Sequence, residues 1–202
     1  MTKASDKPSA REAQRLQTRE RLMGAAIAEF KRGGVAEAEV SAIVSAAGVA
    51  HGTVFFHVPT PEHVLLELEV REEARMAADL TKALKARDDI ATVLAESVRV
   101  VQDLERRLGP RLFKDFLALH FSTSRPPDEE STNHPYIVAV VDQIERARLR
   151  GETNGKIDSF HLGVFFLLGL YALLITLPEA PDVRRPVLEQ YVASNLHGMV
   201  AP

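Results

Sequence analysis

The sequence predicts an all-α protein. Ala, Leu, Glu and Arg, which favour helices, are abundant, whereas runs of alternating β-branched residues are missing. Apolar residues recur at helical spacing through most of the chain, and glycines and prolines gather between these periodic stretches, where helices end. With 46% hydrophobic residues in a chain of 202, a substantial core can form. These patterns predict nine helices.

Three of the nine helices are expected in the first 60 residues. Residues 1–10 are polar and rich in Lys, Ser and Pro, which predicts a disordered tail. Each of the three periodic stretches that follow ends at a glycine or a proline, and the helices are expected at residues 11–33, 40–47 and about 50–58. The sequence therefore predicts a three-helix domain over residues 11–60.

The remaining six helices are expected to form a second domain over residues 61–202. Thr60 and Pro61 suit the N-cap and first turn of the fourth helix. A polar, Pro-rich stretch, Ser122–His134, predicts a loop after the sixth helix. The six helices are expected at residues 61–87, 89–108, 110–120, 136–150, 158–177 and 182–199.

Several kinds of chemistry are not expected. The chain has no cysteine, which excludes disulfides and thiolate metal sites. Its seven histidines are scattered, with no HExxH motif and no close pair, so we expect no metal site and no cofactor. A glycine-rich phosphate loop and a GxSxG turn are also missing, so an enzyme built on a helical bundle is the least favoured interpretation.

The segment Val40–Val58 predicts a helix-turn-helix. Its two short helices meet at Ala47-Gly48-Val49, where Gly48 allows the positive φ of a tight turn and Val49 fills the space between the helices. The first helix of the domain supplies the apolar wall that this unit lacks. The second short helix would lie in the major groove of DNA, with its N-terminal residues facing the base edges.

At these residues the sequence resembles the TetR family, and the resemblance extends over essentially the whole chain. The matching features are Phe30-x-x-Gly33, Ile43-x-x-Ala46-Ala47-Gly48-Val49, Gly52-Thr53-Val54-Phe55 with His57, and Glu62 with Leu65. The resemblance implies an N-terminal DNA-binding domain and a C-terminal domain for ligand binding and dimerisation. It also implies a cytoplasmic, one-component bacterial repressor that binds palindromic operator DNA as a homodimer.

The resemblance and the helix-turn-helix pattern together predict which residues contact DNA. These are Arg19, Ser41, His51, Gly52, Thr53, Phe56, His57 and Thr60. For His51 and His57, an exposed residue without a function is the alternative, and Phe56 could instead pack in the core.

Cations are scarce in the predicted DNA-binding domain. Residues 1–60 hold eight Lys and Arg against six Asp and Glu, a net charge of +2, and no Lys or Arg occurs between Gly33 and Arg71. Glu39 stands where the family usually has Thr or Ser, and Pro61 where it usually has Lys. Because phosphate contacts supply most of the affinity for DNA, we expect weak, salt-dependent binding. The alternative is a TetR-fold ligand-binding or interaction protein with a weakened DNA-binding head.

The second domain is expected to hold a small apolar or amphipathic effector. Its helices contribute an aromatic, sparsely polar set of candidates, namely Met76, Ser97, Phe113, Phe116, Leu117, His120, Phe121, Phe166 and Tyr171. For each aromatic residue, ordinary core packing is the alternative. His120 continues a buried stripe four residues after Phe116, and it is either a hydrogen-bonded core histidine or a ligand contact.

The eighth helix is apolar nearly all round, so it must be buried on every side. We interpret it as a buried helix rather than a membrane span, because it contains His161 and two glycines and no second span accompanies it. The eighth and ninth helices of two chains are expected to form a homodimer interface. A large monomeric core is the alternative. The expected interface residues are Phe165, Gly169, Leu173, Leu188, Tyr191 and Leu196.

Overall fold

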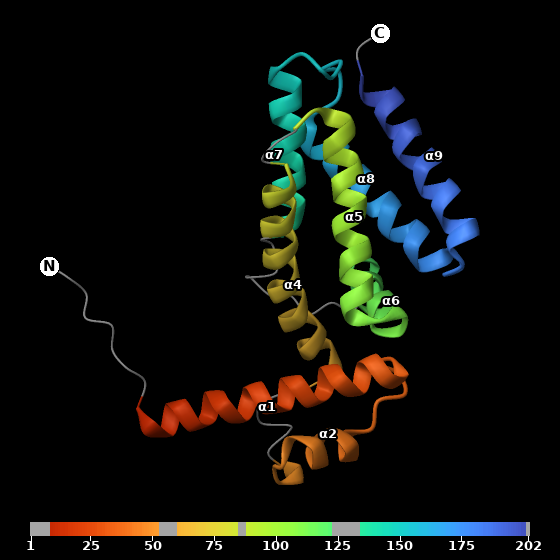
Figure 1. Ribbon diagram of the computed structural model, residues 1–202. Coiled ribbons are helices and arrows are strands. Elements are labelled where there is room, and N and C mark those ends of the chain that lie inside the picture. Colours follow the sequence, from red (N-terminus) through yellow and green to blue (C-terminus); the bar gives the residue numbers. More distant parts are fainter. Residues whose placement is uncertain (1–8, 53–59, 85–87, 123–133, 201–202) are drawn as a thin grey trace, which may run out of the picture. The chain divides into compact units, whose positions relative to one another are not determined.

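The computed structural model describes residues 9–52, 60–84, 88–122 and 134–200 (Figure 1). Within these residues the chain forms eight α-helices and one short 3₁₀ helix, which confirms the all-α class. Of the nine helices expected, the third falls mostly on residues 53–59, outside the described residues. The expected tail also lies outside them, except for Ser9 and Ala10, and Ala10 already begins a helix. The chain divides into two compact units, residues 1–66 and 67–202.

The N-terminal unit is built on α1 (Ala10–Gly33), which packs against α2 (Val40–Ala47). The side chain of Ser9 caps α1 by accepting a hydrogen bond from the backbone N–H of Glu12 (3.3 Å), and this replaces a hydrogen bond that the first turn cannot make internally. The apolar stripe predicted for α1 is buried, and so is one side of α2. The buried apolar residues of the two helices are Leu22, Met23, Ala26, Phe30, Ile43 and Ala47.

Helix α4 (Pro61–Ala83) begins in the N-terminal unit and ends in the C-terminal unit. It is followed by α5 (Ile90–Leu108), which is strongly amphipathic and capped by Asp89, whose carboxylate accepts from the backbone N–H of Thr92 (3.0 Å). Gly109 ends α5, and Pro110 opens α6 (Pro110–Ala118), which continues into the 3₁₀ helix η1 (Leu119–Phe121).

Helix α7 (Pro135–Leu149) packs closely against α8 (Ser159–Thr176). A Cβ at Gly163 of α8 would lie 2.7 Å from Val141 Cγ2, so this glycine is what lets the two helices approach. Helix α9 (Pro181–Met199) contacts α5 and α8 (Figure 1). The largest fully buried side chains of the C-terminal unit are Tyr136, Phe113, Phe116, Phe166, Met76, Leu80, Leu94, Leu104 and Leu108.

Among the described residues, α8 is the helix long and apolar enough to cross a membrane, yet it is a core helix of the C-terminal unit. Phe166, Leu167, Leu170 and Leu174 are fully buried on one side. The other side is not covered by this chain, because the side chains of Phe160 and Phe165 are 56% and 62% exposed; burial on every side stays a prediction that needs a partner chain. One apolar face of α8 is therefore uncovered within a single chain.

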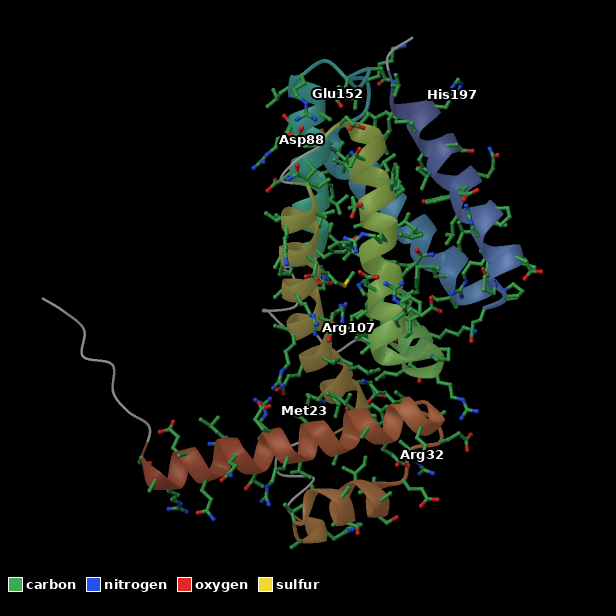
Figure 2. All side chains as sticks on the ribbon, in the orientation of Figure 1. Met23, Arg32, Asp88, Arg107, Glu152 and His197 are labelled. Atoms are coloured by element: carbon green, nitrogen blue, oxygen red, sulfur yellow. The ribbon has the colours of Figure 1, made fainter. Side chains whose placement is uncertain are left out.

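In the C-terminal unit, Arg150 links the end of α7 to the start of α5. The Arg150 guanidinium pairs with Asp88 (3.1 Å) and Glu152 (2.5 Å), and the latter two residues lie at the same end of the unit (Figure 2). The second carboxylate oxygen of Glu152 accepts from the backbone N–H of Ile90 (2.8 Å). This network joins the start of α5 to the end of α7.

Candidate functional site

The turn of the predicted helix-turn-helix is present. Helix α2 ends at Gly48, which adopts the left-handed conformation with φ 63° and ψ 43°. Its backbone N–H donates to the carbonyl of Ser45 (3.2 Å), and that of Val49 donates to the carbonyl of Val44 (3.4 Å). A side chain at Gly48 would be strained in this conformation. The requirement for glycine at this position, expected from the sequence, is confirmed.

A carboxylate joins α1 to the start of α2. Glu29 accepts two hydrogen bonds from the guanidinium of Arg32 (3.2 and 2.5 Å) and a third from the backbone N–H of Glu39 (3.4 Å). The hydrogen bond from Arg32 holds the pKa of Glu29 below its ordinary value. Arg32 lies at the C-terminal end of α1 (Figure 2). Sequence analysis missed this contact, although the i, i+3 spacing of the two side chains is a signal for it.

The predicted DNA-contacting residues divide into two groups. Five lie in described positions and are exposed, namely Arg19, Ser41, His51, Gly52 and Thr60. The other three, Thr53, Phe56 and His57, lie outside the described residues. Glu39 is the N-cap residue of α2 and makes no capping hydrogen bond with its side chain.

The predicted effector-binding residues are mostly buried in the C-terminal unit. Ser97 and Tyr136 form a polar pair inside the core, where the Tyr136 hydroxyl donates to the Ser97 carbonyl (2.8 Å) and the Ser97 hydroxyl donates to the Val93 carbonyl (2.8 Å). Phe121 differs from the rest of the predicted set, because its side chain is 48% exposed. The buried members are Met76, Ser97, Phe113, Phe116, Leu117, Phe166 and Tyr171.

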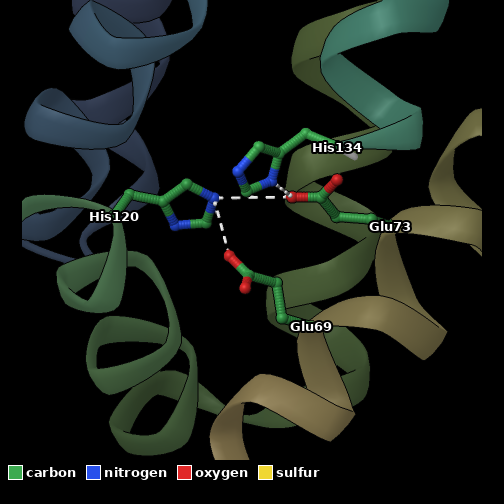
Figure 3. Close-up of side chains that lie close together, drawn as sticks. All are labelled: Glu69, Glu73, His120 and His134. Carbon is green, nitrogen blue, oxygen red and sulfur yellow. Dashed lines mark hydrogen bonds and ion pairs between the residues drawn. The ribbon is translucent and has the colours of Figure 1, made fainter. Parts of the chain in front are cut away.

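His120 lies in a cluster of side chains that are far apart in the sequence. Its Nε2 is 3.2 Å from Glu69 Oε1 and 3.6 Å from Glu73 Oε1, and His134 Nδ1 is 2.8 Å from the same Glu73 oxygen (Figure 3). The ring of Tyr171 meets His120 edge-on, with the ring centroids 5.0 Å apart. Sequence analysis singled out His120 but missed its partners. The i, i+4 spacing of Glu69 and Glu73 on α4 was the available signal.

Burial and hydrogen bonding compete at Glu73. Burial alone would raise the pKa of this carboxyl, but the imidazoles of His120 and His134 outweigh it and hold the pKa below its ordinary value. Burial also raises the pKa of Tyr171, so its phenol stays protonated. A charged carboxylate therefore lies in the core beside two imidazoles.

The predicted dimer residues lie partly within the chain and partly on its surface. Phe165 is exposed, whereas Leu188 is buried in its own chain. Gly169 faces Tyr191 of α9, whose hydroxyl donates to the Phe166 carbonyl (2.6 Å). The close helix approach that was expected at this glycine between chains is thus made within one chain, while Leu173 and Leu196 are half-buried.

An apolar groove of about 590 Å³ runs between α5 and α9. Leu188 and Leu196 of the predicted dimer set line it, together with Val98 and Val192. Two charged residues of α9, Arg185 and Glu189, also line it.

Comparison with known proteins agrees with this geometry. Residues 22–68 match the family described as "Bacterial regulatory proteins, tetR family". This match identifies the N-terminal segment as a DNA-binding domain of the TetR type. No curated protein matches the sequence.

Solved structures of TetR-family members share the fold over most of the chain. The FadR repressor of Thermus thermophilus, solved with lauroyl-CoA, has a TM-score of 0.71 at 20% identity, and the match covers 91% of this chain and 96% of that one. RolR, solved with resorcinol, has a TM-score of 0.69 at 18% identity, with coverage of 93% and 89%. The ketosteroid regulator KstR2 of Mycobacterium tuberculosis has a TM-score of 0.60 at 19% identity, with coverage of 91% and 95%.

Proposed function

We propose that this TetR-family regulator is a ligand-responsive repressor that binds a palindromic operator as a homodimer in the cytoplasm. The single observation that carries the proposal is the left-handed turn at Gly48, which follows α2 in a family-matched segment. A turn of this kind sets the angle at which the next helix enters the major groove.

The proposed DNA contact relies on few charges. Exposed polar side chains occur at Ser41, His51 and Thr60, and Arg19 adds a cation on α1. Without Lys or Arg between Gly33 and Arg71, we expect binding that is ~1–3 kcal/mol weaker than that of a version with two or three more cationic contacts. The same scarcity favours a second candidate, a ligand-binding or interaction protein whose DNA-binding head has lost its affinity.

The proposed dimer uses the face of α8 that a single chain leaves uncovered. Phe160 and Phe165 are exposed on this helix, although its composition suits a buried position. The groove between α5 and α9 is a second apolar surface, and Leu188 and Leu196 of the predicted dimer set line it. A two-fold axis through these helices would place two DNA-binding heads on the two halves of a palindrome.

The proposed effector is a small apolar or amphipathic molecule. The FadR structure with lauroyl-CoA and the RolR structure with resorcinol show such ligands in proteins of the same fold. In this chain the predicted effector residues are largely aromatic or aliphatic and lie in the C-terminal unit. Helix α4 contains residues of both units, so a shift of α4 on binding could change the spacing of the two heads.

A mobility-shift assay on promoter fragments separates the two candidates. The purified chain should retard a fragment of its own upstream region at ~50 mM salt and release it near ~200 mM, because each phosphate contact releases a counterion. Binding to no promoter fragment at ~50 mM salt would exclude the repressor. A ligand-dependent rise in melting temperature without any DNA binding would establish the second candidate instead.

A further inference from the structure

Four side chains with metal-ligating atoms meet inside the C-terminal unit. Glu69 and Glu73 lie one turn apart on α4, His120 belongs to η1, and His134 is the N-cap residue of α7 (Figure 3). One ligating atom from each side chain lies within 4.8 Å of the other three. We propose that this cluster binds a divalent cation of the first transition row. The inference goes beyond the proposed function and does not depend on DNA binding.

Burial makes this cluster unlike an ordinary surface group of charges. The side chains of Glu69, Glu73 and His120 are only 4%, 3% and 5% exposed. His134 is 26% exposed and lies on the solvent side of the group. Charged groups are expensive to remove from water unless an opposite charge or several hydrogen bonds compensate them.

The hydrogen bonds within the cluster do not satisfy its polar atoms. Among the described residues, Glu73 Oε2 and both ring nitrogens of His120 are buried without a hydrogen-bond partner. His120 Nε2 lies 3.2 Å from a carboxylate oxygen of Glu69 and 3.6 Å from one of Glu73, yet neither contact is a hydrogen bond. Apart from the hydrogen bond between His134 Nδ1 and Glu73 Oε1 (2.8 Å), the cluster thus holds buried polar atoms of Glu73 and His120 that a bound ion would satisfy.

The mixed ligand set selects the class of cation. Two imidazoles favour zinc, iron, cobalt, nickel or copper over magnesium and calcium, which prefer oxygen ligands alone. The two carboxylates and the lack of cysteine disfavour soft ions such as Cu(I). Ligand atoms ~2.0–2.2 Å from a tetrahedral ion lie ~3.3–3.6 Å apart, so the cluster, whose ligand atoms lie within 4.8 Å of one another, must contract by about an ångström where they are farthest apart.

Charge balance points in the same direction. Imidazoles bind metals in their neutral form, and the two carboxylates beside them would then offset the two charges of the cation. The rings of Tyr171 and Phe116 are 5.0 and 6.1 Å from the His120 ring, measured between centroids, and they form an apolar wall on the protein side. Such a wall limits access of water and strengthens binding of the cation to its ligands.

The test uses the full-length chain without a histidine tag, stripped of metal with a chelator that is then removed. Titration with Co²⁺ should give visible d–d absorption that saturates at one ion per chain, and Zn²⁺ should displace it. Mg²⁺ at the same concentration should neither bind with a comparable affinity nor displace Co²⁺. The melting temperature should rise with Co²⁺ or Zn²⁺.

Three ligand variants and one matched control locate the site. Glu73→Gln, His120→Gln and His134→Gln should each lower Co²⁺ affinity on the order of 10- to 100-fold or more. His161→Gln removes a histidine whose side chain is 59% exposed and which lies outside the cluster, so it should leave the affinity unchanged. If circular dichroism shows that Glu73→Gln and His120→Gln do not fold, the Co²⁺ affinity of the more exposed variant, His134→Gln, tests the site.

The proposal is overturned if the folded wild-type chain gives no saturable Co²⁺ absorption. It is also overturned if the ligand variants bind as tightly as the wild type, or if His161→Gln loses as much affinity as they do. None of these measurements uses DNA. A failed mobility-shift assay would therefore contradict the proposed repressor without contradicting the metal site.

Discussion

In the N-terminal unit the buried carboxylate Glu29 is paired with Arg32, one turn away on the same helix, and with a backbone N–H. In the C-terminal unit the buried carboxylate Glu73 lies beside His120 and His134, which come from two other elements. The first carboxylate has a permanently charged partner, and the second has only imidazoles, whose charge depends on protonation. The comparison shows that the charged partner of Glu29 comes from its own helix, whereas both partners of Glu73 reach it only through tertiary packing.

The largest expected effect concerns the core of the C-terminal unit. Phe116→Ala should lower the free energy of unfolding by ~3–5 kcal/mol, since it leaves a cavity where a side chain only 2% exposed was packed. Urea denaturation followed by circular dichroism measures this. Phe121→Ala is the matched control, because that side chain is 48% exposed, and its effect should stay within ~0.5 kcal/mol. Equal losses in the two variants would contradict the packing described here.

The next effect concerns the uncovered face of α8. Phe165→Glu places a charge where the proposed dimer buries an aromatic side chain that is 62% exposed in one chain. Dimerisation should weaken by ~2 kcal/mol or more. Light scattering coupled to size-exclusion chromatography should show the mass shift toward the monomer at low concentration. Leu149→Glu on α7, at a side chain 71% exposed, should leave the mass unchanged, and a monomeric wild type would refute the dimer.

In the N-terminal unit the largest effect should come from the turn. Gly48→Ala forces a Cβ into the left-handed region and should cost ~1–2 kcal/mol of stability. Gly24→Ala is the control within α1, where a Cβ would meet nothing within 4 Å, and it should stabilise the helix by ~0.5–1 kcal/mol. Denaturant melts of the two variants should therefore shift in opposite directions. A neutral Gly48→Ala would show that the turn tolerates other residues.

The smallest effect concerns the cations that the DNA-binding head lacks. Pro61→Lys restores a residue that TetR-family members usually have, and it should tighten operator binding by ~1 kcal/mol, or about fivefold. The slope of log affinity against log salt should steepen by ~1. Ala118→Lys adds the same charge at an exposed position of α6 in the other unit and should change neither quantity. If both lysines act alike, net charge rather than position determines the affinity.

Sequence reasoning was most successful where function depends on neighbouring residues. The helix-turn-helix turn, the glycine that it requires and the family could be predicted because a short stretch of chain contains all the relevant residues. The apolar stripe of α1 and the amphipathic α5 followed from helical periodicity in the same way. The DNA-contacting set remains a prediction, and three of its members lie outside the described residues.

Sequence reasoning failed where distant segments meet. The histidines are scattered along the chain, so their spacing gave no reason to expect a metal site, yet folding brings His120 and His134 to Glu69 and Glu73. The role of Gly169 also depends on a partner in another helix, since Tyr191 fills the space beside it within the same chain. No local pattern encodes such pairings.

The sequence by itself determined the all-α class, the helix-turn-helix and the resemblance to the TetR family, because helical periodicity, turn chemistry and a short motif are local properties. Tertiary structure alone decided which charged groups share the core and which face of α8 stays uncovered. It also decided which side chains pack against Gly163 and Gly169. The physical reason is that these features depend on helices packing at particular angles and registers. That packing joins residues whose separation along the chain has no fixed relation to their distance in space.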